Sequence, residues 1–440
     1  MEESLRPKYA EAVVLAVVLA LALGVAQTAP LTLPEAQDLA QRNNETREIA
    51  QARLTRAHAE QRRAWSALIP SLTFQTTFTR RVSEVTRQVG DQNVVLQEAN
   101  GLGGNLSLDW PLFDARAFAG LAAADQGQRA TVLEAAELER ALAFAVATGF
   151  FLVLAEDSLQ EAARQRTLAA ESTLAEAKAR QAAGLAAKNE VTRAELELAT
   201  AKLEVSSAMA AALRARLALS ELIGAEVEAG RSLVEPPPST LPALVSDELV
   251  KQARAARPDF LALGARAEQA DSLEDEPLLR LVPTLSLKGL IFASNEPGLS
   301  GRTIDANVAV ALSWKIFDGG LRYADHAQRW ADLEEARLKI RAAERHVARE
   351  VRESLVGLTT AQAAAELAEV RYRTARQNAE EVHVLYGNGL ASALERVDAA
   401  VSEYDAAAGL SRQKVAVRIA ELEVLRAVGA WPLERAEETR

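Results

Sequence analysis

The chain has 440 residues, a formal net charge of -11, 49% apolar residues and 25% charged residues. This composition is typical of a folded chain and not of a disordered one. The basic residues are spread along the chain, so they do not form a basic face that could bind nucleic acid. The absence of cysteine excludes disulfides, thiolate metal sites, cysteine nucleophiles and a lipidated N-terminal cysteine. Aromatic residues make up only 5%, and alanine-rich, aromatic-poor chains are typical of long packed helices.

Residues 1–26 have the pattern of a secretory signal peptide. Arg6 contributes positive charge, residues 12–25 form an apolar run, and Gly24 and Ala26 are small residues at the spacing that a signal peptidase needs. The run is short for a membrane span, although a retained membrane anchor is the alternative. No later segment is expected to be apolar enough to cross a membrane as a helix, so a membrane location would require a β-barrel.

The first half of the mature chain, residues 31–231, is predicted to start with a helix from Pro34 to Leu68. Two strands follow, at about 71–81 and 104–113, because apolar and polar side chains alternate along both. The connection between them is polar and contains glycine, so we expect a long loop. The same alternation fits an ordinary half-buried sheet of a soluble domain.

Two long helices complete this half. Residues 114–183 have no proline and hardly any glycine, which predicts roughly 105 Å of helix that must pack along its length to be stable. After a turn at Gly184, a second helix is expected to end at Ile223. It carries a coiled-coil seam of small apolar residues: Val191, Leu198, Val205, Ala212 and Leu219, with Ala194, Ala201, Ala208, Ala215 and Leu222. A free-standing coiled coil would show the same seam.

Three consecutive prolines that start at Pro236 indicate a linker over residues 232–242, because they cannot continue a helix. The second half, residues 243–430, repeats the order of elements, with strands at about 283–293 and 304–317. Its last helix carries the seam Leu394, Val401, Ala408, Val415 and Leu422. Residues 271–277 differ from the first half, so we expect an irregular entry into the third strand. Residues 431–440 are predicted to be a polar tail.

The two halves are a tandem repeat. The strand start Ile69-Pro70-Ser71-Leu72 returns as Val282-Pro283-Thr284-Leu285, and the junction Trp110 to Asp114 returns as Trp314 to Asp318. Gly184, Glu190 and Gly224 return at one shared offset as Gly389, Glu395 and Gly429. A shared offset over separate motifs indicates an internal duplication.

Three tryptophans lie next to the predicted strands, at the ends that adjoin the helices. These are Trp65, Trp110 and Trp314. An aromatic girdle occupies this position in a membrane barrel, so in such a barrel the three side chains would lie at one membrane interface and contact its lipid.

The order helix, strand, strand, long helix, turn, helix, present twice, resembles the TolC family of outer-membrane efflux and secretion channels. The strand starts, the Trp-x-x-Phe-Asp junctions and the two Gly-Leu turns followed by an acidic residue carry the resemblance, over nearly the whole mature chain. The resemblance implies a mainly α fold with a β-barrel part. It implies a homotrimer whose four strands per chain close a twelve-stranded outer-membrane barrel on an α-helical periplasmic tunnel. Sharing the barrel would remove the open sheet edges that a membrane does not tolerate.

The resemblance also implies a function and its residues. It implies a passive outer-membrane exit duct for small molecules or proteins, in a tripartite efflux or type I secretion system with a periplasmic adaptor and an inner-membrane pump. The adaptor would dock at the two turns, on Gly184, Leu185, Gly389, Leu390 and Ser392. The periplasmic aperture would be lined by Glu395 and Asp398, with Glu190 as their first-half counterpart. Carboxylate rings favour cations, although solvated charges on helix surfaces fit the same three positions.

No catalytic, cofactor-binding or metal site is predicted, and the chain is not expected to be an enzyme. The four histidines are scattered, and there is no His-Glu-x-x-His pair, Gly-x-Ser-x-Gly elbow or phosphate-binding glycine loop. The energy for transport would therefore come from a partner. The alternative function is a periplasmic coiled-coil adaptor or structural protein of an export complex. An adaptor, however, has one helical hairpin flanked by compact β domains, whereas this sequence predicts two hairpins and two pairs of strands.

Overall fold

The computed structural model describes residues 29–89, 92–228, 230–237, 246–296 and 302–432. The predicted signal peptide therefore lies outside the described residues, as do residues 238–242 of the predicted linker and 433–440 of the predicted tail. The chain forms two compact units, and each contains segments of both sequence halves. The helical unit comprises Met1–Glu48, Leu138–Ala256 and Val347–Arg440, and the sheet unit comprises Ile49–Glu137 and Arg257–His346.

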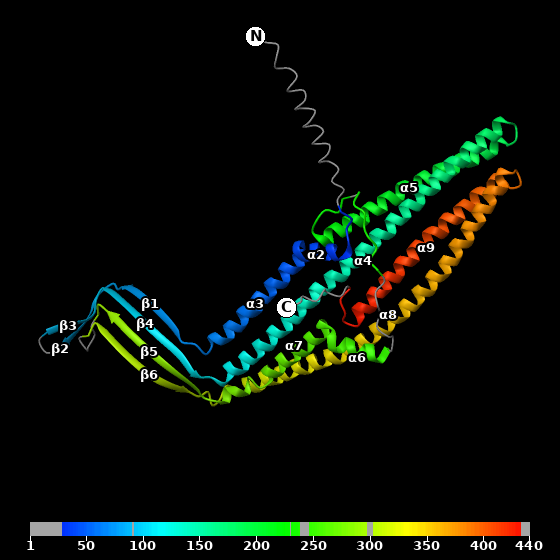
Figure 1. Cartoon of the computed structure of the whole chain (residues 1–440). Coiled ribbons are helices and arrows are strands. Elements are labelled where there is room, and N and C mark those ends of the chain that lie inside the picture. The colour runs from blue at the N-terminus through cyan, green and yellow to red at the C-terminus, as the bar shows by residue number, and fades with distance from the viewer. Residues whose placement is uncertain (1–28, 90–91, 229, 238–245, 297–301, 433–440) are drawn as a thin grey trace, which may run out of the picture. The chain divides into compact units, whose positions relative to one another are not determined.

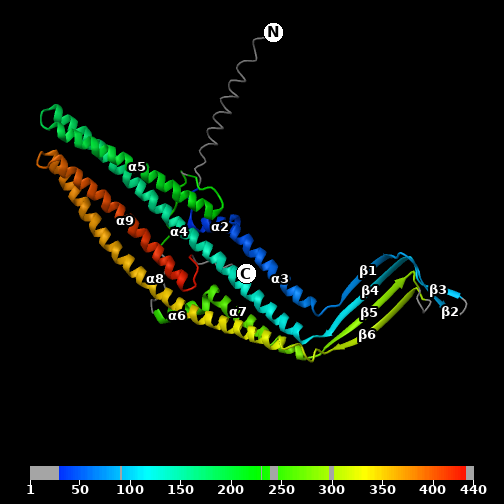
Figure 2. The ribbon, with the colours of Figure 1, turned by 180° about the vertical axis from the view of Figure 1, so that it is seen from behind.

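Two hairpins of long helices dominate the helical unit (Figures 1 and 2). The first hairpin consists of α4 (Ala115–Ala182) and α5 (Lys188–Ile223), and the second of α8 (Leu321–Gly387) and α9 (Ala393–Ala427). Both α4 and α8 continue into the sheet unit. The long helix predicted over residues 114–183 and the turn that follows it are confirmed.

The main apolar core of the helical unit joins α4, α5, α9 and the short helix α2 (Leu33–Asn43). Phe144, Phe150, Leu219 and Leu422 are among its buried members. The predicted seam of α5 faces inward, since Ala194, Ala201, Ala212 and Leu219 are each at most 3% exposed. Alanine at these positions lets the helix backbones approach closely.

One expectation about membrane spans was wrong. Among the described helices, α4 contains an 18-residue stretch that is long and apolar enough to cross a membrane. Of that stretch, 56% is buried inside the protein. Val146, Phe150 and Val153 of the same helix are fully buried in the core, so packing against neighbouring helices accounts for its apolar composition.

The single helix predicted from Pro34 to Leu68 is in fact two helices, α2 and α3 (Glu45–Ser66). The break lies at Asn44, whose side-chain amide donates a hydrogen bond to Leu222 O at 3.0 Å. Its side-chain oxygen accepts a hydrogen bond from Thr46 N at 2.9 Å, which caps α3. The corresponding helices of the second half are α6 (Ser246–Ala256) and α7 (Pro258–Glu274). A 3-10 turn at Leu278–Leu281 then makes the irregular entry that was predicted for the third strand.

Gly224 follows α5 as its C-cap. Both its backbone conformation and the space around its Cα favour glycine at this position. Its φ is +68°, and a Cβ added there would lie 2.8 Å from Asn43 O. We expect Gly224→Ala to lower the free energy of unfolding by roughly 1–3 kcal/mol, measured by thermal unfolding in detergent. Gly184→Ala is the matched control, because Gly184 has a φ of +71° with no atom within 4 Å of the added Cβ. Equal losses in the two variants would show that the contact with Asn43 does not contribute.

The four predicted strands pair into one antiparallel sheet in the order β1-β4-β5-β6 (Figure 1). The strands are β1 (Ser71–Arg80), β4 (Asn100–Phe113), β5 (Thr284–Ser294) and β6 (Ile304–Ser313). The pairing of β4 with β5 joins the two halves of the repeat. Its register places Leu106 opposite Phe74 on one side and Ile291 on the other, so apolar side chains share one face.

A β-hairpin lies where the sequence predicted a loop. Its strands, β2 (Val85–Val89) and β3 (Gln92–Gln97), follow β1 and precede β4 in the sequence and form a separate two-stranded sheet. Strand β4 also begins before residue 104, the predicted start. Its glycines were expected in the loop, but Gly103 and Gly104 pair with Thr77 and Thr76 of β1.

The last strand is shorter than predicted. Strand β6 ends at Ser313, not at residue 317. The reason lies in Arg322 of α8, which is only 2% exposed and donates hydrogen bonds to Lys315 O at 3.0 Å and Ile316 O at 3.2 Å. Its ion pair with Asp318 fixes the start of the helix, so the chain leaves the sheet early.

The apolar face of the sheet is uncovered. Leu72, Phe74 and Val308 are 66%, 72% and 76% exposed, and β1 is exposed along its whole length. An ordinary half-buried sheet would cover this face, so that alternative does not fit. Strands β1 and β6 each have one unpaired edge within the described sheet. On the polar face, Lys288 forms an ion pair with Asp109 at 3.7 Å.

Candidate functional site

The two hairpin turns of the helical unit have the same local structure. Gly184 and Gly389 adopt φ values of +71° and +76°, which favour glycine. Leu185 N donates to Arg180 O, and Leu390 N donates to Leu385 O, each at 2.8 Å. These bonds close each helix with a glycine cap. They also project the side chains of Leu185 and Leu390, which are 72% and 75% exposed.

The second turn ends in a capping box at the start of α9. Ser392 Oγ accepts a hydrogen bond from Glu395 N at 3.3 Å, and the Glu395 carboxylate accepts one from Ser392 N at 2.7 Å. The backbone and hydroxyl bonds from Ser392 hold the pKa of Glu395 below its ordinary value. The first turn lacks this cap, because its N-cap residue is Ala187. The predicted aperture residue Glu395 therefore also has a structural role.

The two other predicted acids lie beside the same turns. Asp398 is exposed on α9, one turn after Glu395. Glu190 is half-buried on α5. Burial chiefly raises the pKa of the Tyr386 hydroxyl, and the charge of Glu190 raises it further. Glu190 is thus electrostatically coupled to the second hairpin, whereas Asp398 faces outward.

A buried cluster that was not predicted from the sequence joins the two turns, and we call it the Tyr386 cluster. Its members are Tyr386, Arg180, Arg396, Glu176 and Thr173. The Tyr386 side chain is 0% exposed, with the guanidinium groups of Arg180 and Arg396 4.7 and 5.1 Å from the centre of its ring. Arg180 also donates a hydrogen bond to Tyr386 O at 2.6 Å. The hydroxyl of Tyr386 has no hydrogen-bond partner among the described residues.

Arg396 connects α9 to α4. Its Nε donates to Thr173 Oγ1 at 3.1 Å, and its Nη1 donates to Glu176 Oε2 at 2.9 Å. The Arg396 and Glu176 side chains are 9% and 30% exposed, so water screens this pair only in part. The Tyr386 cluster therefore holds the first hairpin against the second. This link consists of hydrogen bonds, one ion pair and two cation–π contacts.

A second link lies farther from the turns, at Arg166 of α4. The Arg166 side chain is 6% exposed and forms ion pairs with Glu197 and Glu204 of α5. Its guanidinium lies 5.0 Å from the ring centre of Tyr404 on α9. Burial opposes the positive charge of Arg166, but the hydrogen bond and charge of Glu197 and the charge of Glu204 raise its pKa overall. Arg166 therefore connects α4 to both α5 and α9 at this point.

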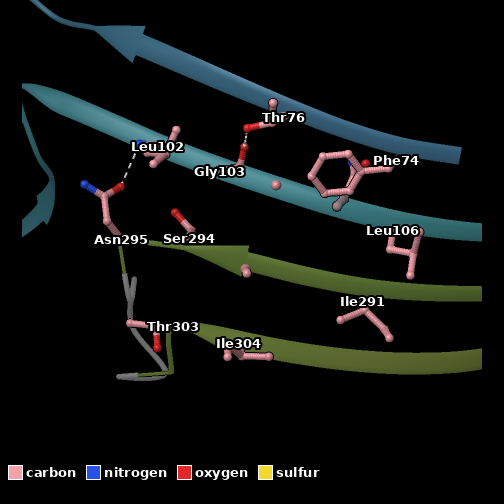
Figure 3. A pocket seen from close by; sticks show the side chains of 13 residues that line it. Phe74, Thr76, Leu102, Gly103, Leu106, Ile291, Ser294, Asn295, Thr303 and Ile304 are labelled. Carbon is pink, nitrogen blue, oxygen red and sulfur yellow. Dashed lines mark hydrogen bonds between the residues drawn. The ribbon is translucent and has the colours of Figure 1, made fainter.

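The three predicted interface tryptophans all belong to the sheet unit. Trp65, Trp110 and Trp314 are 49%, 40% and 57% exposed. Trp314 Nε1 donates to Leu281 O at 2.9 Å, at the end where the helices meet the sheet. Toward the opposite end, a groove on the sheet is lined by residues that include Phe74, Leu106, Ile291 and Ile304 (Figure 3).

One signal for the Tyr386 cluster was present in the sequence. Tyr386 immediately precedes the glycine-containing second turn, in a chain with only 5 tyrosines. A tyrosine that follows Val384 and Leu385 at the end of a helix indicates a buried contact. No helical period, however, predicts which arginines of the other helices reach that ring.

The comparisons with known proteins agree on family and fold. The family model described as outer membrane efflux protein matches residues 36–225 and 249–430. No curated protein matches the chain closely enough to count as a relative. A membrane protein from Pseudomonas aeruginosa has a similar structure, with a TM-score of 0.77 and 21% identity, covering 93% of this chain and 92% of that chain.

Two further solved structures are similar over most of their length. The outer membrane protein VceC from Vibrio cholerae has a TM-score of 0.75 and 20% identity, covering 91% of this chain and 97% of that chain. The Campylobacter jejuni CmeC outer membrane channel has a TM-score of 0.77 and 16% identity, covering 90% of this chain and 85% of that chain. At these identities the likeness is one of fold.

Proposed function

Because the chain belongs to the outer membrane efflux protein family, we propose that it is a passive outer-membrane exit duct. It serves a tripartite efflux or type I secretion system and exports small molecules or proteins. The duct is not an enzyme, and an inner-membrane pump supplies the energy. A periplasmic adaptor connects the pump to the duct, and outer-membrane lipid surrounds its sheet.

The uncovered sheet is the observation that carries this proposal. Leu72, Phe74 and Val308 are largely exposed on one face of the sheet. Contact of this apolar face with lipid is more favourable in free energy than its contact with water. The unpaired edges of β1 and β6, however, are costly in a membrane, because lipid offers their backbone groups no hydrogen bonds. Three chains remove both problems when β1 of each pairs with β6 of the next, which closes a twelve-stranded barrel. Trp65, Trp110 and Trp314 then lie at one membrane interface.

A second apolar seam on the long helices supports the trimer. On α5, Leu196, Leu203 and Leu217 are 68%, 68% and 59% exposed, on the side away from the buried seam. On α8, Leu367 and Val370 are 72% and 50% exposed. In the trimer, α5 of one chain packs against α8 of the next and covers both sets. The closed ring of helices is the periplasmic tunnel.

The hairpin turns form the periplasmic end of this tunnel. The adaptor docks on the exposed Leu185 and Leu390, next to Gly184, Gly389 and Ser392. Glu395 and Asp398 line the aperture, and the Tyr386 cluster keeps it narrow by holding the second hairpin against the first. Glu190 adds its charge beside Tyr386. Opening then requires the release of this cluster.

The aperture charges can be tested without losing the helix cap. Glutamine serves in a capping box as glutamate does, so Glu395→Gln combined with Asp398→Asn removes two carboxylates per chain and keeps α9 intact. We expect the preference for cations over anions to fall severalfold, measured as reversal potential in a salt gradient across a planar bilayer. Glu423→Gln, far from the turn on the same helix, is the control. An unchanged reversal potential in the double variant would place the selectivity elsewhere.

Extraction and heat treatment separate this proposal from the alternative, a periplasmic coiled-coil adaptor or structural protein. An outer-membrane duct is extracted from bacterial envelopes only with detergent, and it migrates on gels as a trimer until it is heated. An adaptor is released without detergent and shows no heat-modifiable trimer. The second result would overturn the proposed function.

A further inference from the structure

Hairpin β2–β3 is attached to the main sheet at the end away from the helices. Its first flanking residue, Arg81, directly follows β1, and Arg81 N donates to Ala99 O at 2.7 Å. Arg81 Nη1 also donates to Glu98 O at 2.8 Å. The chain therefore leaves β1 and returns to β4 through a closed, hydrogen-bonded base.

Glu296, from the second half of the chain, binds this base. Its carboxylate accepts hydrogen bonds from both terminal nitrogens of Arg81, and the bond from Nη2 to Oε2 is 3.3 Å long. It also accepts a hydrogen bond from Glu98 N at 3.0 Å. The Arg81 and Glu296 side chains are 25% and 16% exposed. A two-point ion pair that also satisfies a backbone N–H has one favoured geometry. It therefore fixes the orientation of the hairpin base relative to Glu296 as well as the distance between them.

Asn295 makes a second attachment beside the first. Its side-chain oxygen accepts a hydrogen bond from Leu102 N at 2.7 Å, and its side-chain amide donates to Asn100 O at 2.9 Å (Figure 3 draws the first of these). Asn295 N also donates to Leu102 O at 3.0 Å. Residues 295 and 296 thus extend the pairing of β5 with β4 and hold the start of β4.

Gly101 leaves the space that these contacts need. A Cβ added there would lie 2.9 Å from Glu296 Oε1 and 3.0 Å from Arg81 Nη1. Glycine in this strand therefore serves the ion pair rather than a turn. Arg81, Gly101, Asn295 and Glu296 act together, and we call them the mouth clamp.

We infer that the mouth clamp holds hairpin β2–β3 at the exit end of the sheet and makes it a size filter at the extracellular mouth. The inference rests on the proposed function, because the helices at the other end of the sheet place this end outside the cell. In a trimer, three clamped hairpins surround one opening. A solute that has crossed the tunnel then passes between them, and their fixed position limits its size.

Limited proteolysis tests the clamp without any assumption about transport. In detergent-purified Glu296→Gln, trypsin should cut after Arg87 of β2 roughly tenfold faster than in the wild type, because the lost charged bonds raise the population of the detached hairpin. Gly101→Ala should act in the same direction while keeping every charge. Glu84→Gln, an exposed carboxylate of the same loop, is the control for net charge. Wild-type cleavage rates in both clamp variants would overturn the inference.

Permeation tests the filter itself. Cells that carry Glu296→Gln should become more sensitive to a large glycopeptide antibiotic added outside, and single channels should pass larger polyethylene glycols than the wild type. Faster cleavage without any change in the size limit would leave a clamp but refute the filter. A wild-type protein that forms no channel would instead refute the proposed function, whatever the cleavage rates.

Discussion

Replacing Arg396 by methionine is expected to raise the open probability of the duct about tenfold to hundredfold. The variant loses the bonds to Thr173 and Glu176 and one of the two guanidinium groups on the Tyr386 ring. Hydrogen bonds to charged groups contribute about 1.5–3 kcal/mol each, and the loss leaves the partly buried Glu176 unpaired. Both effects favour the open arrangement of the hairpins. Single-channel recording in a planar bilayer measures the open probability directly.

Arg376→Met is the matched control for this prediction. Arg376 lies on α8 and pairs with Glu380 of the same helix at 3.0 Å, but both side chains are well exposed, at 58% and 66%. Exposed pairs of this kind contribute about 0–1 kcal/mol and connect nothing across the hairpins. The open probability should stay at the wild-type value. An effect equal to that of Arg396→Met would mean that general charge, not the Tyr386 cluster, keeps the duct closed.

Replacing Arg166 by methionine is expected to lower the free energy of unfolding by about 3–5 kcal/mol. The substitution leaves Glu197, whose side chain is 11% exposed, without its buried partner, and it also removes the contact with Tyr404. A buried carboxylate without a counter-charge is costly, so the α4–α5–α9 contact should loosen first. Loss of helical circular dichroism on heating in detergent gives the change in stability.

Arg164→Met, two residues earlier on the same helix, separates burial from charge. Arg164 approaches Glu161 at 4.0 Å, and both side chains are more than half exposed. The expected change in the free energy of unfolding is about 0–1 kcal/mol. If Arg166→Met were as stable as Arg164→Met, the buried ion pairs would not hold the three helices together.

Repeating patterns of apolar residues along single helices and strands made most of the fold predictable. The uninterrupted run before Gly184 predicted α4 to within a residue at either end, and the alanine seam predicted which side of α5 is buried. Alternation along residues 71–81 predicted β1 and its apolar face. These features depend on local periodicity, which one sequence contains in full.

Contacts between distant segments were not predictable in the same way. Arg396 meets Glu176, and Arg81 meets Glu296, across more than two hundred residues of chain. Charged residues are frequent on every helix, so no spacing rule selects these pairs. Strand β4 was predicted too short because glycine is rare inside strands, whereas Gly103 and Gly104 here pair with both β1 and β5. The capping box at Ser392 follows a local rule, but Glu395 was considered only as an aperture charge.

Three copies of this chain are proposed to form one continuous duct, which can be tested by the conductance of the detergent-extracted wild-type protein in a planar bilayer. We expect discrete, cation-preferring steps of low open probability from a heat-modifiable trimer. A protein that is released without detergent and gives no conductance would contradict it, and would favour a periplasmic coiled-coil protein instead.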